Sequence, residues 1–378
     1  DRKRAAVLAA RAARGVARRA ARVGRGVVEV SARRTREIAT LIAVVAVAAI
    51  LRSPFLETGL WRDEAATYFE TTAPNIAKAL HEIGLAEISP PGYFLLMRAW
   101  IALMGVSDVA YKLPSFIFSL AAVILTYLLG RTLRSHASGI VAACLGTATL
   151  SGMMLAGTAR PYALAAALTA SAALAALATL RRPSWRYAIV YACLAYAVME
   201  VQYTGIVVVA TFAVVAAAQA ASAERRRGAL RLLAASAVAA LAYAPQVPLF
   251  IHTARVSVPW LPTLQPQSLA GRAIEQFTYV LPFEVARTAL ALECILPALV
   301  LAIVYRKRLL VSDYPLLVLL VLVATWLETK ALLLHPRYMF AYTPLADAVV
   351  GAALVTLVAR VRSLVTARRW HARAFVTA

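Results

Sequence analysis

Long apolar runs, separated by short polar segments, recur along most of the chain. Each run is close to the roughly 20 residues that an α-helix needs to cross the hydrocarbon core of a bilayer. We therefore predict an all-α polytopic membrane protein. About ten spanning helices are expected, at residues 38–55, 113–130, 138–157, 162–180, 186–200, 204–221, 230–251, 288–304, 312–329 and 339–359.

Two shorter apolar segments follow the first of these runs. Residues 73–83 have an apolar face at helical spacing, and residues 90–105 are apolar with Arg98 in their middle. We predict that both are interfacial helices, which lie on the membrane surface within the long loop 56–112.

The distribution of basic residues supports this placement. If residues 90–105 do not span, four short loops on one side of the membrane contain twelve Lys or Arg, and the loops on the other side after Gly157 contain six. An excess of Lys and Arg marks cytoplasmic loops. Both termini are therefore predicted to be cytoplasmic, with loops 56–112 and 252–287 outside, in the cytoplasmic membrane of a bacterium.

Composition agrees with a membrane protein and gives three segments. The 378 residues are 62% hydrophobic and 15% charged, with a formal net charge of +22. Most of the positive excess lies in the basic segment 1–37, in short loops and in the basic tail 361–378, which indicates anionic lipid rather than nucleic acid as the partner. Residues 38–360 are then the functional domain. The first apolar run resembles a signal peptide, but its long basic lead-in favours a retained anchor.

The candidate chemistry begins with two adjacent acids, Asp63 and Glu64, which follow the first predicted span in the segment "WRDEAATY". Neighbouring positions on a helix point about 100° apart. Glu64 therefore shares a face with Tyr68, and Asp63 shares one with Thr67. One carboxylate can face a reaction centre while the other orients it. The alternative is that both are solvated loop acids beside Arg62.

Two other segments place cations on the same side of the membrane. Arg160 precedes a proline at a predicted helix start, and such a start with a neighbouring Arg can bind an anion. The segment "ETKALLLHPRYMFAYTPL" contributes Lys330, His335, Arg337 and Tyr338. The alternatives are an Arg that reaches the lipid headgroups and an aromatic and basic belt.

An acid facing several cations at a membrane surface suits sugar transfer from a polyprenyl phosphate. The departing phosphate can be stabilised by Arg and Lys, so the reaction needs no general acid. It needs one general base to take a proton from the acceptor hydroxyl. A glycosidase would instead need two separated carboxyl groups. The three cysteines lie in apolar segments and indicate neither disulfides nor a metal site.

Five motifs carry a resemblance that covers roughly residues 38–345: "WRDEAATY", "SPPGYFLL", "ARPYALAAAL", "QYTGIVVV" and "HPRYMFAYTPL". In this order and setting, the chain resembles the GT-C membrane glycosyltransferases, in the branch that contains protein O-mannosyltransferases and the bacterial lipid A aminoarabinose transferase. The resemblance implies an inverting transfer from a polyprenyl-phosphate sugar to a lipid, glycan or protein hydroxyl on the extracytoplasmic face.

The resemblance also implies residue roles. Asp63 would be the catalytic base, with Glu64 in support. The donor phosphate would be bound by Arg160, Lys330, His335, Arg337 and Tyr338, and the substrate cleft would be lined by Tyr68, Ser89, Tyr93, Tyr162, Gln202 and Tyr203. Ser89 departs from the pattern, since relatives commonly carry His or Lys there. No acidic metal-binding pair is visible, so no cofactor and no obligatory catalytic metal are expected.

Two other functions compete with the transferase. A transporter or lipid-linked sugar flippase should have charged residues in mid-helix and internal repeats. The charges here cluster at helix ends instead, which favours the enzyme. A non-catalytic membrane partner with the same fold would not need the acid and cation set that the chain retains.

Overall fold

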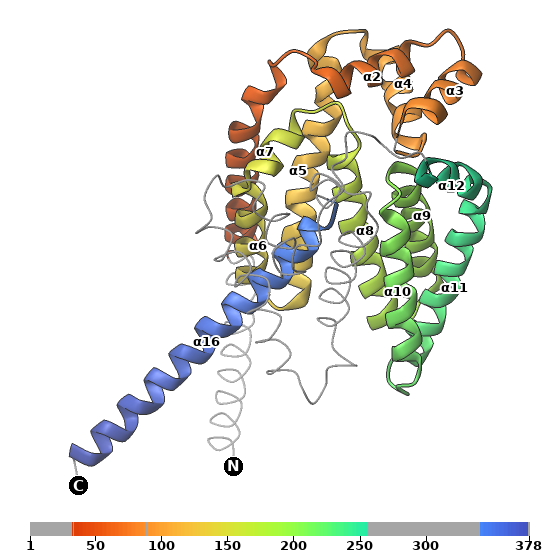
Figure 1. The fold of residues 1–378 in the computed structure, drawn as a ribbon. Coiled ribbons are helices and arrows are strands. Elements are labelled where there is room, and N and C mark those ends of the chain that lie inside the picture. The colour runs from red at the N-terminus through yellow and green to blue at the C-terminus, as the bar shows by residue number, and fades with distance from the viewer. Residues whose placement is uncertain (1–31, 33, 88, 256–340, 377–378) are drawn as a thin grey trace, which may run out of the picture. The chain divides into compact units, whose positions relative to one another are not determined.

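The computed structural model describes residue 32 and residues 34–87, 89–255 and 341–376. Within these ranges every regular element is a helix, which confirms the predicted all-α class (Figure 1). The contacts divide the chain into a unit of residues 1–44 and a second unit of residues 45–378. The elements described below belong to the second unit.

The helices follow one another in this order: η1 (Ser53–Leu56), α2 (Arg62–Thr72), α3 (Ile76–Ala86), α4 (Gly92–Met104), α5 (Asp108–Leu133), α6 (His136–Ala148), α7 (Leu150–Ala156), α8 (Tyr162–Arg181), α9 (Trp185–Val201), α10 (Gly205–Ala220), α11 (Arg226–Tyr243), η2 (Ala244–Gln246), α12 (Val247–Arg255) and α16 (Thr343–Val376).

Five stretches of the described residues are helical, long and apolar enough to cross a membrane: Arg34–Leu56, Asp108–Leu133, Tyr162–Arg181, Arg226–Thr253 and Thr343–Thr366. The chain is thus an integral membrane protein. Helices α4, α6 and α10 are apolar but shorter. The predicted spans 288–304 and 312–329 lie outside the described residues, as does almost all of the basic segment 1–37.

Two predicted spans contain interruptions that the apolar pattern does not reveal. The run 138–157 divides at Thr149, whose extended backbone ends α6 and begins α7. Buried Arg52 donates from Nη2 to the carbonyl of Gly146 at 2.8 Å and from Nε to that of Gly152 at 3.3 Å, so it binds carbonyls on both sides of the break. The run 230–251 changes to a 3₁₀ turn at Ala244–Gln246, where Pro245 cannot continue the α-helical hydrogen bonds.

Both segments predicted to be interfacial are helical, as α3 and α4, and their place at the membrane surface stays a prediction. Asn75 caps α3 by accepting a hydrogen bond from the backbone N–H of Lys78 at 2.8 Å. Arg98, in the middle of α4, donates from Nη1 to the carbonyls of Thr71 and Ala73 at 3.0 and 2.7 Å. A cation at the carbonyl end of α2 is favourable, which explains a charge within an otherwise apolar segment.

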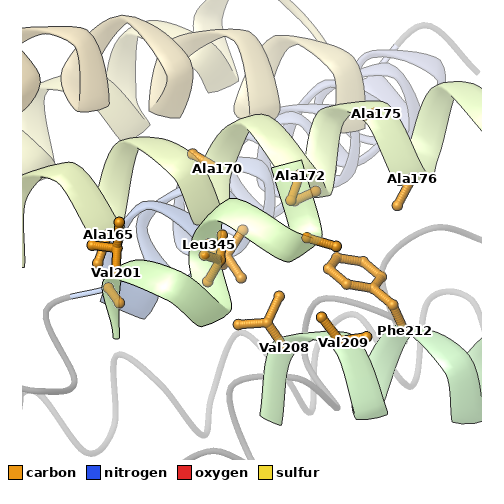
Figure 2. Packing of buried hydrophobic residues seen from close by; sticks show 14 of the residues in the cluster. Ala165, Ala170, Ala172, Ala175, Ala176, Val201, Val208, Val209, Phe212 and Leu345 are labelled. Carbon is orange, nitrogen blue, oxygen red and sulfur yellow. The ribbon is translucent and has the colours of Figure 1, made fainter. Parts of the chain in front are cut away.

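Small residues let the central helices approach one another. Helix α8 is rich in buried alanine, and Figure 2 shows Ala165 and Ala172 of this helix in one buried cluster with Val208 of α10 and Leu345 of α16. Between α5 and α6, a Cβ at Gly130 would lie 2.8 Å from the carbonyl oxygen of Ser138. Close backbone approach through Gly and Ala is how helices associate where no water is displaced.

Helices α2, α3 and α4 lie together at one end of α5, α8 and α9, where α12 also lies (Figure 1). A Cβ at Gly84 of α3 would be 3.7 Å from Leu249 of α12. A Cβ at Gly92 would lie only 2.5 Å from the carbonyl oxygen of Glu200, so the start of α4 presses directly on the end of α9. The candidate site lies at this end.

Candidate active site

The Glu64 carboxylate fastens the start of α2 to the connector between α7 and α8. Its side chain is buried, with 2% exposed. Oε2 accepts a hydrogen bond from the backbone N–H of Trp61 at 2.9 Å, and Oε1 accepts one from Ala159 at 2.6 Å. The first bond satisfies an N–H that no intrahelical carbonyl can reach. Glu64 therefore has a positioning geometry, with each oxygen on a backbone donor.

Asp63 occupies the neighbouring position with a different environment, because its side chain is half-buried. It begins a stripe along α2 that continues with Thr67 and Glu70 at i+4 and i+7. The hydroxyl of Thr67 donates to the carbonyl of Ala159 at 3.0 Å. Both backbone groups of Ala159 are thus bound by α2, which fixes Asp63 beside the residue that follows, Arg160.

Arg160 is buried and paired with Glu87 from the connector between α3 and α4. Nη1 and Nη2 each donate to one oxygen of Glu87 at 2.7 Å, a bidentate pair with only 6% of Arg160 exposed. Nη1 also donates to the backbone carbonyl of Asp63 at 3.2 Å and lies 3.5 Å from Oγ1 of Thr67. The guanidinium carbon lies 5.7 Å from the ring centroid of Phe94.

The third member of the α2 stripe, Glu70, is 3% exposed and reaches the same pair. Burial is the largest cause that raises the pKa of its carboxyl to about 9. The charge of Glu87 and a hydrogen bond with it act in the same direction, and Arg160 opposes them. A pKa raised this far favours the protonated form of Glu70 near neutral pH.

The predicted cleft residues separate into two groups. Ser89, Tyr93, Tyr162 and Gln202 are buried near the starts of α4, α8 and α10. Burial raises the pKa of the Tyr93 hydroxyl well above its usual value, so this phenol stays neutral.

The other two tyrosines pack on neighbouring rings. Tyr68 contacts Phe69 and Tyr111, with ring centroids 5.4 and 6.0 Å away. Tyr203 lies 5.2 Å from the ring of Phe250 on α12. Both tyrosines are partly exposed.

Several solved structures have a fold similar to that of this chain. ArnT from Cupriavidus metallidurans in the apo state matches with a TM-score of 0.57 and 13% identity, over 83% of this chain and 59% of that one. The oligosaccharyltransferase AglB from Archaeoglobus fulgidus, in complex with an inhibitory peptide and a dolichol-phosphate, matches with a TM-score of 0.54 and 14% identity, over 89% and 52%. The chain has the GT-C glycosyltransferase fold.

Two further comparisons bear on the GT-C assignment. Residues 89–250, less than half of the chain, match the family model described as dolichyl-phosphate-mannose-protein mannosyltransferase. ArnT from Cupriavidus metallidurans bound to undecaprenyl phosphate matches with a TM-score of 0.51 and 11% identity, over 84% of this chain and 59% of that one. No curated protein matches. The chain spans between about half and three fifths of the structures it resembles, and the predicted resemblance to GT-C enzymes is confirmed.

The structure brings the backbone of Asp63 and the side chains of Glu64 and Arg160 together, and their catalytic and phosphate-binding roles stay predictions. The predicted donor-phosphate residues Lys330, His335, Arg337 and Tyr338 lie outside the described residues. Within the ranges that are described, no three His, Cys, Asp or Glu side chains gather as a candidate metal site.

Sequence reasoning missed the two acids that surround Arg160. Glu70 follows Asp63 at i+7 on the same helical face, so extending the Asp63–Thr67 stripe by one turn would have found it. Glu87 is a lone acid two residues before the serine of "SPPG" and 73 positions from Arg160. One indication of this pairing is present in the sequence: Glu87 is an acid in an otherwise apolar segment, where a charge without a partner is costly.

Proposed function

We propose that this protein is an inverting glycosyltransferase that moves a sugar from a polyprenyl-phosphate donor to an acceptor hydroxyl. The fold supports this proposal, because a similar structure was solved with undecaprenyl phosphate and another with a dolichol-phosphate. The match of residues 89–250 to mannosyltransferases that use a dolichyl-phosphate sugar points the same way.

The observation that carries the proposal is the division of labour between Asp63 and Glu64. Both oxygens of Glu64 accept backbone hydrogen bonds, so this residue holds the connector. Asp63 is half-buried at the first turn of α2, and Arg160 donates to its backbone carbonyl. We assign Asp63 as the general base that takes the proton of the acceptor hydroxyl while the sugar–phosphate bond breaks. The phosphate leaves with the bonding electron pair.

The leaving phosphate needs positive charge. Arg160 is already matched by one carboxylate, so most of the attraction for the phosphate has to come from elsewhere. We assign this role to Lys330, His335, Arg337 and Tyr338, with Arg160 completing the set. No catalytic metal is required by this arrangement of roles.

The proposed topology places the site at the outer surface of a bacterial cytoplasmic membrane. Ten spans would put both termini in the cytoplasm and loops 56–112 and 252–287 outside. The basic segment 1–37 would then bind anionic lipids, with residues 38–360 as the catalytic domain and 361–378 as a cytoplasmic tail. The acceptor is a lipid, a glycan or a protein.

The proposal is tested by incubating purified protein in lipid with a panel of polyprenyl-phosphate sugars and membrane extract, and by measuring the release of polyprenyl phosphate. We expect release by the wild type and a loss of at least about 100-fold in Asp63→Asn, since removal of a general base costs that much or more. Asp108→Asn is the matched control, an exposed acid in the first turn of α5 within the same loop.

Three outcomes would contradict the proposal. The first is no release from any donor by folded wild-type protein, which would refute the reaction class. The second is full activity in Asp63→Asn, which would move the base elsewhere. The third is equal loss in the Asp108→Asn control, which would attribute the effect to the loop rather than to one carboxylate.

A further inference from the structure

The acid Glu70 has an environment that the proposed chemistry does not use. Its side chain is 3% exposed, and neither carboxyl oxygen accepts a hydrogen bond from any residue that the structure describes. A buried carboxylate without a donor is among the most costly groups that a protein can contain. Either the Glu70 carboxyl is protonated and neutral, or another positive charge or hydrogen-bond donor has to offset the cost of burying its negative charge.

The charged groups around Glu70 come from four parts of the chain. The connector between α3 and α4 brings Glu87, that between α7 and α8 brings Arg160, and α3 brings Glu82. Helix α4 brings Arg98, whose Nη1 is bound to the carbonyls of Thr71 and Ala73. On α2 itself, Asp63 lies two turns before Glu70, and the carboxylate of Glu64 accepts hydrogen bonds from backbone N–H groups.

The one buried cation within this set is already matched. Arg160 gives two parallel 2.7 Å bonds to Glu87, which is a one-to-one ion pair. Among the residues that the structure describes, a second negative charge at Glu70 would face Glu87 with no further buried cation beside it. Two carboxylates that share a buried site cannot both ionise easily, so one of them retains a proton.

Glu87 can accept the hydrogen bond that a proton on Glu70 would supply. A carboxylate has about four acceptor positions, and the guanidinium of Arg160 uses one on each oxygen. Glu70 and Glu87 lie within reach of each other, and a hydrogen bond between them requires that one of the two acids carries a proton.

We propose that Glu70 is a protonated positioning residue, whose hydroxyl donates to Glu87 and so holds Glu87 against Arg160. The proton stays on the Glu70 oxygen, and no bond to substrate is involved. The interaction joins α2 to both connectors, and because Arg160 also binds the carbonyl of Asp63, it sets the place of the assigned base. The consequence for catalysis rests on the proposed function; the protonation itself does not.

The first test measures thermal unfolding of the purified full-length protein in lipid nanodiscs at pH 5 to 10. The folded state retains a proton up to pH about 9 that the unfolded chain releases near 4.5, so stability is full below pH 4.5 and falls until pH 9. Gln cannot ionise but can donate the same hydrogen bond. The melting temperature of Glu70→Gln should therefore match the wild type at pH 5 and exceed it by about 5 °C or more at pH 9.

Two comparisons separate this effect from general ones. Glu57→Gln removes an exposed acid in the same loop and should keep a constant offset from the wild type at every pH. Glu70→Leu fills similar space without a donor, so it should melt lower than Glu70→Gln at pH 6. A constant offset between Glu70→Gln and the wild type across the whole range would overturn the proposal, and so would equal melting of the Gln and Leu variants.

The second test follows the pH profile of polyprenyl phosphate release. Wild-type kcat should decline as the pH passes about 9, and Glu70→Gln should remove that decline without changing KM at pH 7. Absence of release from the wild type would refute the proposed function alone, because the melting comparison still decides the protonation of Glu70. Identical alkaline declines in both proteins would refute the positioning role.

Discussion

At the scale of single residues, two adjacent acids have different surroundings because a helix points them in different directions. Glu64 turns toward backbone N–H groups of Trp61 and Ala159, whereas Asp63 lies on the face that carries Thr67. Adjacent acids on a helix point about 100° apart, so one can support structure while its neighbour faces substrate. The same separation makes their substitutions distinguishable by experiment.

We predict that Glu64→Ala destabilises the protein by about 3 kcal/mol, because two backbone N–H groups lose their acceptor and the one at Ala159 is buried. Thermal unfolding in detergent measures this change. Glu57→Ala, at an exposed acid in the same loop, is the control and should leave the melting temperature unchanged. An unchanged melting temperature in Glu64→Ala would show that water replaces the carboxylate at both donors.

At the scale of elements, the position of the site depends on how closely α4 approaches α9. Gly92 begins α4 where any side chain would strike the backbone of Glu200. The adjoining residues Tyr93 and Phe94 are buried, and Phe94 lies under the guanidinium of Arg160. The position of α4 along α9 therefore decides where Tyr93 and Phe94 lie relative to Arg160.

We expect Gly92→Ala to destabilise the protein by about 1–3 kcal/mol, because the added Cβ would lie 2.5 Å from a backbone oxygen that cannot rotate away. Gly59→Ala is the matched control, since its Cβ would lie 3.9 Å from the nearest atom, a carboxylate oxygen of Asp108. Melting temperatures of both variants, measured in the same detergent, give the comparison. Equal behaviour of the two variants would mean that α4 can shift without cost.

The sequence predicted elements better than it predicted their interruptions and pairings. Apolar runs fixed α5, α8, α9 and α10 to within a few residues, since hydrophobicity decides which segments enter a bilayer. The break at Thr149 was not predicted, and the side chain that binds carbonyls on both sides of it, Arg52, is distant in sequence. The pair of Arg160 with Glu87 escaped notice for the same reason, since sequence spacing does not encode contacts between separate segments.

At the scale of the whole molecule, the site lies just beyond the first candidate span. That span ends at Leu56, and α2 begins at Arg62 with the assigned base next in sequence. A polyprenyl-phosphate donor is half lipid, so its sugar and phosphate stay at the membrane surface while its tail remains among the apolar helices. In the proposed topology, the start of α2 would place Asp63 at the depth that such a donor requires.

The proposed orientation predicts opposite labelling of two loops. In a background with all three native cysteines changed to Ala, Glu57→Cys should react with a membrane-impermeant maleimide in intact cells. Ala223→Cys, in the connector between α10 and α11, should react only after permeabilisation. Both positions are exposed, so access alone decides the result. The reverse labelling pattern would show that the protein has the opposite orientation, with Asp63 on the cytoplasmic side.

Helix α16 continues without interruption from Thr343 to Val376, a length of 34 residues. At 1.5 Å per residue it measures about 50 Å, whereas the hydrocarbon core is about 30 Å thick. Its first turns are packed among the other helices, and every side chain from Leu357 to Thr366 is exposed. A helical fusion partner joined in register to this helix would thus be carried rigidly beyond the bilayer, where it could serve as an alignment marker for electron cryomicroscopy of this 40.5 kDa chain.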